Sequence, residues 1–328
     1  MLNNFSTINL STQSRDLLER QKASWDLANT GYSGLKDVRF REFDIDGNQI
    51  KVQFNPGRMV STTAKVDAKS IKERPCFLCS ENLPAAQEKL RYNDKFNILV
   101  NPFPIFPEHF TIPHVNHTPQ LIKEWFPEML NMARDLSEKY LVFYNGPNCG
   151  ASAPDHMHFQ AGTKHFMPLD AHLINKKDKH DIALYREFGL EVYSLDDGLR
   201  KMIGIDGVKE SAIIEAFNSF YKIYSEINPG DPEPMMNIVC LFYPEWETWR
   251  TLILLREKHR PERYFAEGNE RIMLSPAAVD LGGVGVIPVQ EDFERINVQI
   301  ITEIFHEVFI SEDKFSVLVE KLRGLSSI

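Results

Sequence analysis

The sequence predicts an α+β fold built from two tandem copies of one unit, each an antiparallel sheet with flanking helices. Two observations support this prediction: strand-like and helix-like patterns alternate along the chain, and a short pattern recurs. The recurring pattern pairs Phe96-Asn97-Ile98-Leu99 with Met236-Asn237-Ile238-Val239, Phe103-Pro104 with Tyr243-Pro244, and Thr111-Ile112 with Thr251-Leu252. Chance similarity between two apolar strands is the alternative explanation. We expect a helix and hairpin in residues 1–53, a first unit in 54–180 and a second in 181–328.

The composition is that of an ordinary globular protein. The 328 residues are 43% hydrophobic and 25% charged, and the net charge is −9. A negative chain is a poor partner for nucleic acid or an anionic membrane, so an anionic small molecule would need a local basic pocket. No apolar run has the length of a membrane span, and residues 1–20 lack a signal-peptide core. We therefore expect a cytoplasmic protein.

The N-terminal elements follow from local patterns. Apolar residues at helical spacing predict a helix over residues 12–29. Two alternating segments, Val38 to Ile45 and Gln49 to Phe54, flank Asp46-Gly47-Asn48, which predicts a hairpin.

The middle of the chain predicts strands around one long helix. Phe96 to Val100 is a strand, and Phe110-Thr111-Ile112 is another that ends at Pro113. Thr118 and Pro119 suit the start of a helix that runs to about Lys139, with a kink at Pro127. Tyr140 to Tyr144 is a strand that leads into a glycine-rich turn over residues 145–153.

The run His156-Met157-His158-Phe159-Gln160 is the main chemical signal. On a strand, both imidazoles and Gln160 would share one face, and Met157 and Phe159 would face a core. A neutral imidazole is a competent nucleophile towards an activated phosphorus atom, and it divides group transfer into two steps. Gln160, Ser152 and the backbone N–H groups of residues 150–153 are candidate donors to a phosphate. Ordinary exposed or core histidines are the alternative.

The pair Cys76 and Cys79 indicates a metal site. In a reducing compartment a C-x-x-C pair belongs to a metal site or a redox motif, and the flanking Pro75 and polar loop do not match a redox motif that opens a helix. Structural zinc takes four Cys and His ligands. Candidates for the remaining two are His109, His114, His117 and His156. Such a metal would position the catalytic strand.

Four stretches together resemble one branch of the histidine-triad superfamily. They are Phe54-Asn55-Pro56-Gly57-Arg58 with Ser61 and Lys65, Cys76-Phe77-Leu78-Cys79 with Asn82, Asn101 to Pro113, and Asn145 to Gln160. This branch contains galactose-1-phosphate uridylyltransferase, diadenosine tetraphosphate phosphorylase and plant-type GDP-galactose phosphorylase. The resemblance covers residues 54–160, and it implies two histidine-triad-like lobes, of which the second, without a His-x-His, is degenerate.

The resemblance implies a role for individual residues. His158 would take the nucleotidyl group as a phosphoramidate, and Gln160 would hold its phosphoryl oxygens. One zinc ion would be bound by Cys76, Cys79, His156 and His117, with His114 as the reserve for the last ligand. Substrate contacts would come from Asn55, Arg58, Lys65, Asn145, Gly150 and Ser152.

The resemblance also implies a class of reaction. A third-position Gln goes with transferases and phosphorylases, and a third His goes with hydrolases. We expect a nucleotide sugar or dinucleotide as substrate and phosphate or a sugar phosphate as acceptor. A nucleotide hydrolase and a non-catalytic nucleotide-binding protein are the alternatives. Relatives often pair two chains, so a homodimer is a further expectation. Val239 to Pro244 lacks the extra histidines of uridylyltransferases, and this departure argues against a second metal site and against galactose 1-phosphate as substrate.

Overall fold

The computed structural model describes residues 9–63, 67–170 and 181–324. Its strands are β1 Arg39–Ile45, β2 Asn48–Phe54, β3 Lys89–Tyr92, β4 Phe96–Val100, β5 His109–Pro113, β6 Tyr140–Asn145, β7 His158–Thr163, β8 Asp181–Glu187, β9 Leu190–Asp196, β10 Lys201–Gly207, β11 Met236–Tyr243, β12 Thr248–Leu255 and β13 Val284–Ile287. Its α-helices are α1 Leu10–Ser24, α2 Asp26–Gly34, α3 Met59–Thr62, α4 Ala68–Glu73, α5 Phe126–Asp135, α7 Glu210–Ile227, α8 Glu262–Phe265, α9 Ala278–Leu281, α10 Gln290–Arg295, α11 Val298–Val308 and α12 Glu312–Arg323.

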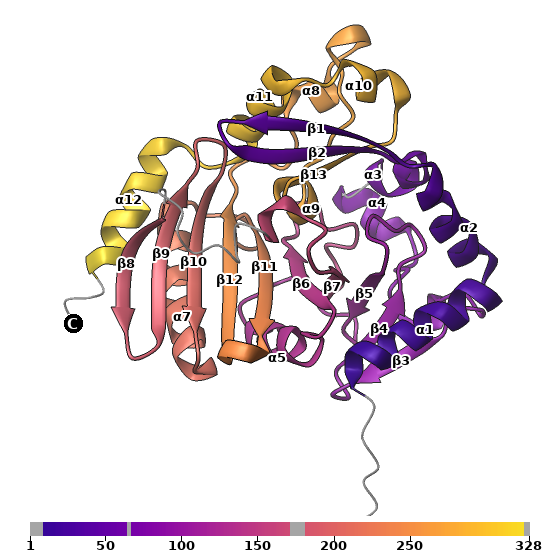
Figure 1. The fold of residues 1–328 in the computed structure, drawn as a ribbon, viewed down its shortest axis with the longest axis horizontal. Helices are drawn as coiled ribbons and strands as arrows, with labels where there is room; N and C mark the ends of the chain where they lie inside the picture. Colours follow the sequence, from indigo (N-terminus) through magenta and orange to yellow (C-terminus); the bar gives the residue numbers. More distant parts are fainter. Residues whose placement is uncertain (1–8, 64–66, 171–180, 325–328) are drawn as a thin grey trace, which may run out of the picture.

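One large antiparallel sheet organises the described part of the chain (Figure 1). Its ten strands lie in the order β3-β4-β5-β7-β6-β11-β12-β10-β9-β8. A second sheet of three strands has the order β1-β2-β13, with β13 parallel to β2. The α+β class predicted from the sequence is therefore confirmed. None of the described helices is long and apolar enough to span a membrane.

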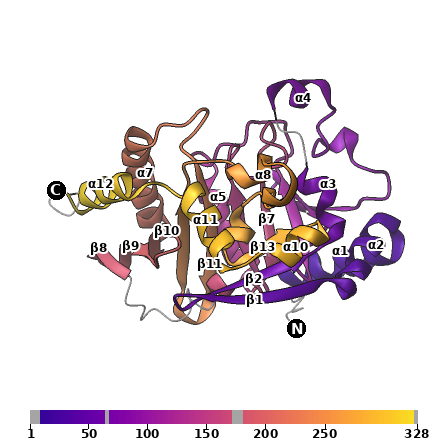
Figure 2. The same ribbon diagram turned by 90° about the horizontal axis from the view of Figure 1, so that it is seen from above.

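The large sheet has a separate apolar core on each face. Because side chains alternate along a strand, Val142 and Tyr144 of β6 enter one core, and Leu141 and Phe143 enter the other. The first core also holds apolar residues of α1, α5, α7 and α12. The second is closed by the small sheet and by α9 and α11. Seen from above, α11 lies near the middle of the molecule (Figure 2).

The order of strands repeats within the large sheet. In chain order, β3-β4-β5-α5-β6-β7 is followed by β8-β9-β10-α7-β11-β12, and both sets of strands have the same spatial order. The two sets meet where β6 pairs with β11 in antiparallel register. The topology thus equates β6 with β11, whereas the sequence pattern had equated β4 with β11. The correspondence predicted between the two repeats was therefore wrong. β4 and β11 have similar sequences because both are fully buried strands.

Several local predictions are confirmed, and two helix predictions need correction. The hairpin β1–β2 forms as expected, although Asn48, predicted in the turn, pairs with Ile45 as the first residue of β2. Strands β4, β5 and β6 lie where strands were predicted. The helix predicted over residues 12–29 is broken at Trp25, whose backbone is extended, into α1 and α2. The boundaries at residues 53 and 180 remain predictions.

The helix predicted from Thr118 to Lys139 is the larger error. Only α5 (Phe126–Asp135) forms, and Pro127 lies in its first turn and not at a kink. The preceding segment is held by other partners: the Met157 N–H donates to the Thr118 carbonyl at 2.6 Å, and the Gln120 N–H donates to the Pro154 carbonyl at 3.3 Å. Backbone groups that a helix would have used are therefore bonded to the segment that precedes β7.

Candidate active site

His158 opens β7 on the floor of a cavity of about 390 Å³. β7 lies between β5 and β6, and the register places Thr111 opposite Gln160 and Gln160 opposite Phe143. Leu99 of β4 extends this row, since it pairs with Thr111. All four residues line the cavity together with His158. The floor is therefore a straight cross-strand row.

The imidazole of His158 is held in one tautomer. Its Nδ1 lies 2.7 Å from the His156 carbonyl oxygen, an acceptor, so Nδ1 carries the proton. The side chain is 5% exposed, and burial lowers the pKa of His158 to about 4. The ring is therefore neutral at pH 7, and Nε2 keeps its lone pair. A neutral, oriented imidazole of this kind can act as a nucleophile.

Gln120 clamps the backbone of His158. Its Oε1 accepts from the His158 N–H at 2.7 Å, and its Nε2 donates to the His158 carbonyl at 3.0 Å and to the Asn145 carbonyl at 2.9 Å. The side chain is fully buried. Sequence analysis missed this residue, because Gln120 was assigned to the first turn of a helix that does not form.

The amide of Gln160 is oriented by His109. The Ile105 N–H donates to His109 Nδ1 at 3.3 Å, so Nε2 carries the proton and donates to Gln160 Oε1 at 3.0 Å. Burial, with a smaller effect from Arg58, lowers the pKa of His109 to about 3, which keeps this ring neutral. The Nε2 group of Gln160 is left as a donor on a residue that lines the cavity. His109, a candidate metal ligand from the sequence, therefore contacts Gln160 and does not belong to the cysteine cluster.

Asn145 and the turn after β6 form the next part of the wall. Asn145 Oδ1 accepts from Asn237 Nδ2 at 2.8 Å and from the Ala278 N–H at 2.9 Å, which leaves its Nδ2 as the donor. Gly150 has φ +94°, and a Cβ there would lie 2.6 Å from the Ala277 Cβ. Both the backbone conformation and the close approach therefore require glycine. Gly150 and Ser152 line the cavity, as does Asn145.

The residues near β2 that were predicted to contact substrate lie in different surroundings. Arg58 lines the cavity, and one Nη donates to the Phe103 carbonyl at 2.6 Å. Asn55 does not line it: its Nδ2 donates to Gln53 Oε1 and to the Pro104 carbonyl, both at 3.1 Å, inside the fold. Asn55 is therefore bonded within the fold in this structure, and its contact with substrate stays a prediction. Lys65 lies outside the described residues.

The prediction of a shared face for the histidine run is only partly right. His158 and Gln160 face the cavity, and Met157 and Phe159 lie in the core of the opposite face. His156, however, precedes β7 and turns towards the cysteine pair. The strand period does not apply to it, because the chain enters the sheet only at His158.

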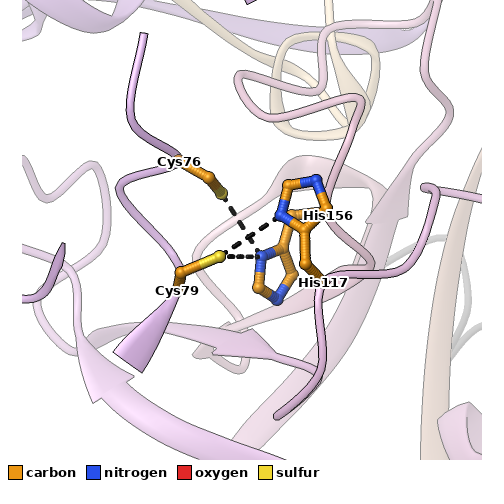
Figure 3. Close-up of side chains that lie close together, drawn as sticks. All are labelled: Cys76, Cys79, His117 and His156. Atoms are coloured by element: carbon orange, nitrogen blue, oxygen red, sulfur yellow. Dashed lines mark hydrogen bonds between the residues drawn. The ribbon is translucent and has the colours of Figure 1, made fainter. Parts of the chain in front are cut away.

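Cys76, Cys79, His117 and His156 form a cluster that can hold a metal ion such as zinc (Figure 3). Their ligand atoms all lie within 4.8 Å of one another. His156 Nδ1 is 3.3 Å from Cys76 Sγ, and His117 Nδ1 is 3.2 Å from Cys79 Sγ. Tetrahedral zinc, with bonds of about 2.3 Å to sulfur and about 2.0 Å to nitrogen, separates two such ligands by roughly 3.5 Å. The donor set and spacing therefore fit zinc.

The far nitrogens of both cluster imidazoles have partners. His156 Nε2 lies 2.7 Å from the His114 carbonyl, and His117 Nε2 lies 3.6 Å from Asp155 Oδ2. Such contacts orient metal-binding imidazoles so that the opposite nitrogen faces the ion. His114, the reserve ligand, instead packs its ring 4.5 Å from that of Trp125 and contacts Asn116 through Nδ1.

The second half of the chain contributes cavity residues outside the stretches that carry the family resemblance. They follow β12 or lie around α9 and on β13: His259, Arg260, Ser275, Ala277, Val279, Asp280 and Val286. The basic run Lys258-His259-Arg260 after an apolar strand was the one available signal. Its proximity to His158 depends on the way the C-terminal segment folds back over the sheet.

Comparisons with known proteins identify similar sequences and folds. A family model described as a domain of unknown function (DUF4922) matches residues 17–163. The chain is 30% identical over 145 residues to diadenosine 5',5'''-P1,P4-tetraphosphate phosphorylase 2 of Saccharomyces cerevisiae. That match covers 40% of this chain and 44% of the yeast protein, so it spans less than half of the relative.

Solved structures extend the likeness over most of the fold. Yeast Ap4A phosphorylase Apa2 in complex with AMP matches with a TM-score of 0.57 at 18% identity, covering 90% of this chain and 96% of that chain. The complex of Apa2 with Ap4A gives 0.59 at 16% identity, covering 91% and 97%. The resemblance to the phosphorylase branch is therefore confirmed as similarity in both sequence and fold.

Proposed function

We propose that this protein is a nucleotidyltransferase or phosphorylase that acts on a nucleoside diphosphate sugar or a dinucleoside polyphosphate through a nucleotidyl-His158 intermediate. The observation that carries the proposal is the state of His158: Nδ1 is bonded to a carbonyl, and Nε2 of this neutral ring has no hydrogen bond to any described residue and belongs to the lining of a cavity. The phosphorylase similarity supports the same class of chemistry.

The reaction has two displacements at one phosphorus atom. In the first, His158 Nε2 forms a P–N bond to the nucleotidyl phosphorus, and the P–O bond to the leaving group breaks, with the electron pair going to the leaving oxygen. In the second, an oxygen of phosphate or a sugar phosphate attacks, the P–N bond breaks, and neutral His158 is restored. Gln160, Asn145 and Arg58 offer N–H donors where charge develops on the phosphoryl oxygens.

Zinc in the Cys76, Cys79, His117 and His156 cluster would supply rigidity. His156 belongs to the cluster through its ring, and its carbonyl accepts the Nδ1 proton of His158. Fixing the His156 ring therefore also fixes the acceptor that sets the tautomer of His158. We further propose that the second lobe, residues 181–328, completes the wall of the cavity.

The proposal is tested by trapping the intermediate. The purified protein is incubated with Ap4A and with nucleoside diphosphate sugars, quenched, and analysed by intact mass spectrometry. A mass increase of one nucleotidyl group on the wild type, absent from His158→Gly, is expected. His165→Gly is the matched control, since His165 does not line the cavity, and it should keep the adduct.

A wild type without any adduct would contradict the covalent mechanism. Where an adduct forms, product analysis with and without inorganic phosphate separates a phosphorylase from a hydrolase. A phosphorylase releases a nucleoside diphosphate only when phosphate is present. A hydrolase releases the monophosphate in either case.

A further inference from the structure

The cavity wall from the second half of the chain carries an arginine to which the reaction above gives no role. Arg260 lies between β12 and α8 and lines the cavity together with Ser275. Its Nε donates to Ser275 Oγ at 2.9 Å, and its guanidinium carbon lies 4.3 Å from the centre of the Tyr264 ring. These two contacts fix the plane of the guanidinium and, among the described residues, leave its terminal N–H groups available.

Arg260 has no ion-pair partner within the described part of the chain: no carboxylate oxygen lies within 4.0 Å of its nitrogens. Arg58, the other arginine that lines the cavity, also has no ion pair with a described carboxylate, and its Nε is buried without a hydrogen bond to the described residues. The lining has one described carboxylate, Asp280, and its oxygens accept from the Ala277 and Val286 N–H groups. In a protein of net charge −9, a cavity lined by two arginines and one carboxylate is suited to an anion with more than one charge.

The Arg260 loop is held by a second arginine, Arg256, which is fully buried. Its guanidinium donates to the carbonyls of Lys258 and His259, at 2.9 and 3.0 Å, and to Asn237 Oδ1 at 2.7 Å. Asn237 in turn donates to Asn145 Oδ1 at 2.8 Å. A continuous set of hydrogen bonds therefore fixes the Arg260 loop relative to Asn145 in the wall of the cavity.

The sheet gives the approximate distance between the strand of His158 and the residue that anchors the Arg260 loop. Asn237, which anchors the loop, lies on β11, and β11 is the second strand from β7 in the order β7-β6-β11. Strands are about 4.8 Å apart, so the anchor is roughly 10 Å from the strand of His158. A single phosphoryl group on His158 does not extend over that distance, whereas a chain of phosphates does.

We infer that Arg260, with Ser275, binds a phosphate group beyond the phosphorus that His158 attacks, and that the substrate is a nucleoside whose leaving group is an oligophosphate. This inference rests on the proposed function and makes it more specific, since a leaving group with one phosphate would not occupy the Arg260 subsite. The incoming phosphate of the second displacement is the other source of the same chemistry.

The test measures the binding of inorganic tripolyphosphate to the intact protein by isothermal titration calorimetry. Arg260→Met is expected to weaken binding roughly 10- to 100-fold, which is the effect of losing charge-assisted hydrogen bonds. Arg260→Lys keeps the charge without the planar fork and should fall between Arg260→Met and the wild type. Arg323→Met, at the exposed end of α12, removes the same charge elsewhere and should bind as the wild type does.

Equal affinity in Arg260→Met and the wild type would overturn the inference. If Arg260→Met does not fold, as judged by thermal unfolding, Arg260→Lys and Ser275→Ala decide, and unchanged affinity in both would overturn it. Titration with orthophosphate in parallel separates the leaving group from the incoming phosphate. If Arg260→Met also binds orthophosphate more weakly than the wild type does, the subsite holds the incoming phosphate as well. If orthophosphate binding is unchanged, the subsite holds the leaving group alone.

Covalent labelling of the wild type keeps this test apart from the mechanism, because tripolyphosphate binding is measured without any nucleotidyl transfer. Loss of binding in Arg260→Met together with no covalent adduct on the wild type would refute the mechanism and retain the anion subsite. An adduct together with full binding in Arg260→Met would refute the subsite alone.

Discussion

Replacement of Gln120 by methionine should destabilise the protein and misplace His158. Methionine has nearly the same length and no hydrogen-bonding amide, so Gln120→Met removes three buried hydrogen bonds, two to His158 and one to Asn145, with little change in volume. At about 1–2 kcal/mol for each bond whose backbone partner is left buried, the loss is about 3–6 kcal/mol. For 328 residues the unfolding entropy is about 0.7 kcal/mol per kelvin, so the Tm should fall by about 4–9 °C.

Differential scanning calorimetry measures this shift, and the rate of adduct formation below the transition measures the effect on His158. Gln299→Met is the control, because Gln299 is exposed on α11 and its amide donates to the neighbouring Glu303 of the same helix. Its Tm should be close to that of the wild type. A Tm for Gln120→Met equal to that of the control would refute the view that this amide holds the start of β7. An unchanged rate of adduct formation would refute its role in positioning the imidazole.

Three further changes test the metal cluster, the phosphate contacts and a buried carboxylate. Cys76→Ala should lower both the zinc content, measured by mass spectrometry of the metal, and the Tm, because it leaves three ligands; full metal occupancy would remove Cys76 from the site. Arg58→Ala should weaken nucleotide binding in calorimetry by roughly 10-fold or more, through the loss of a charged donor, and unchanged affinity would mean that Arg58 does not contact the phosphates. Burial raises the pKa of Glu233 to about 7 from its ordinary 4.5, so the folded state keeps this proton to higher pH than the unfolded state. Stability should therefore fall by about 3 kcal/mol as the pH rises from about 4.5 to about 7. Urea unfolding at pH 5 and pH 8 should show this loss in the wild type and not in Glu233→Gln, and an equal pH dependence in both proteins would contradict it.

The sequence by itself determined the features that depend on neighbouring residues. Asp46-Gly47-Asn48 specifies a tight hairpin between two alternating segments, and the structure has that hairpin. Met157 and Phe159 alternate with His158 and Gln160, and they lie on opposite faces of the sheet because a strand has a period of two. The pair Cys76 and Cys79 marked one half of a metal cluster, because three residues of separation bring two thiols within reach of one ion.

Only the tertiary structure decided which distant groups meet. The spacing along the chain did not show which of His109, His114 and His117 is a metal ligand. In the structure, His109 contacts Gln160 and the ring of His114 packs against Trp125, so neither lies in the cluster. The segment that begins at Thr118 has residues typical of a helix start. Its polar groups, however, bond to the segment before β7 and to β7 itself. These long-range bonds outweigh a local helix preference of a few tenths of a kcal/mol to about 1 kcal/mol per residue. Arg260 reaches the cavity of His158 only because the chain returns over the sheet after β12, and no local pattern encodes a contact across about 100 residues.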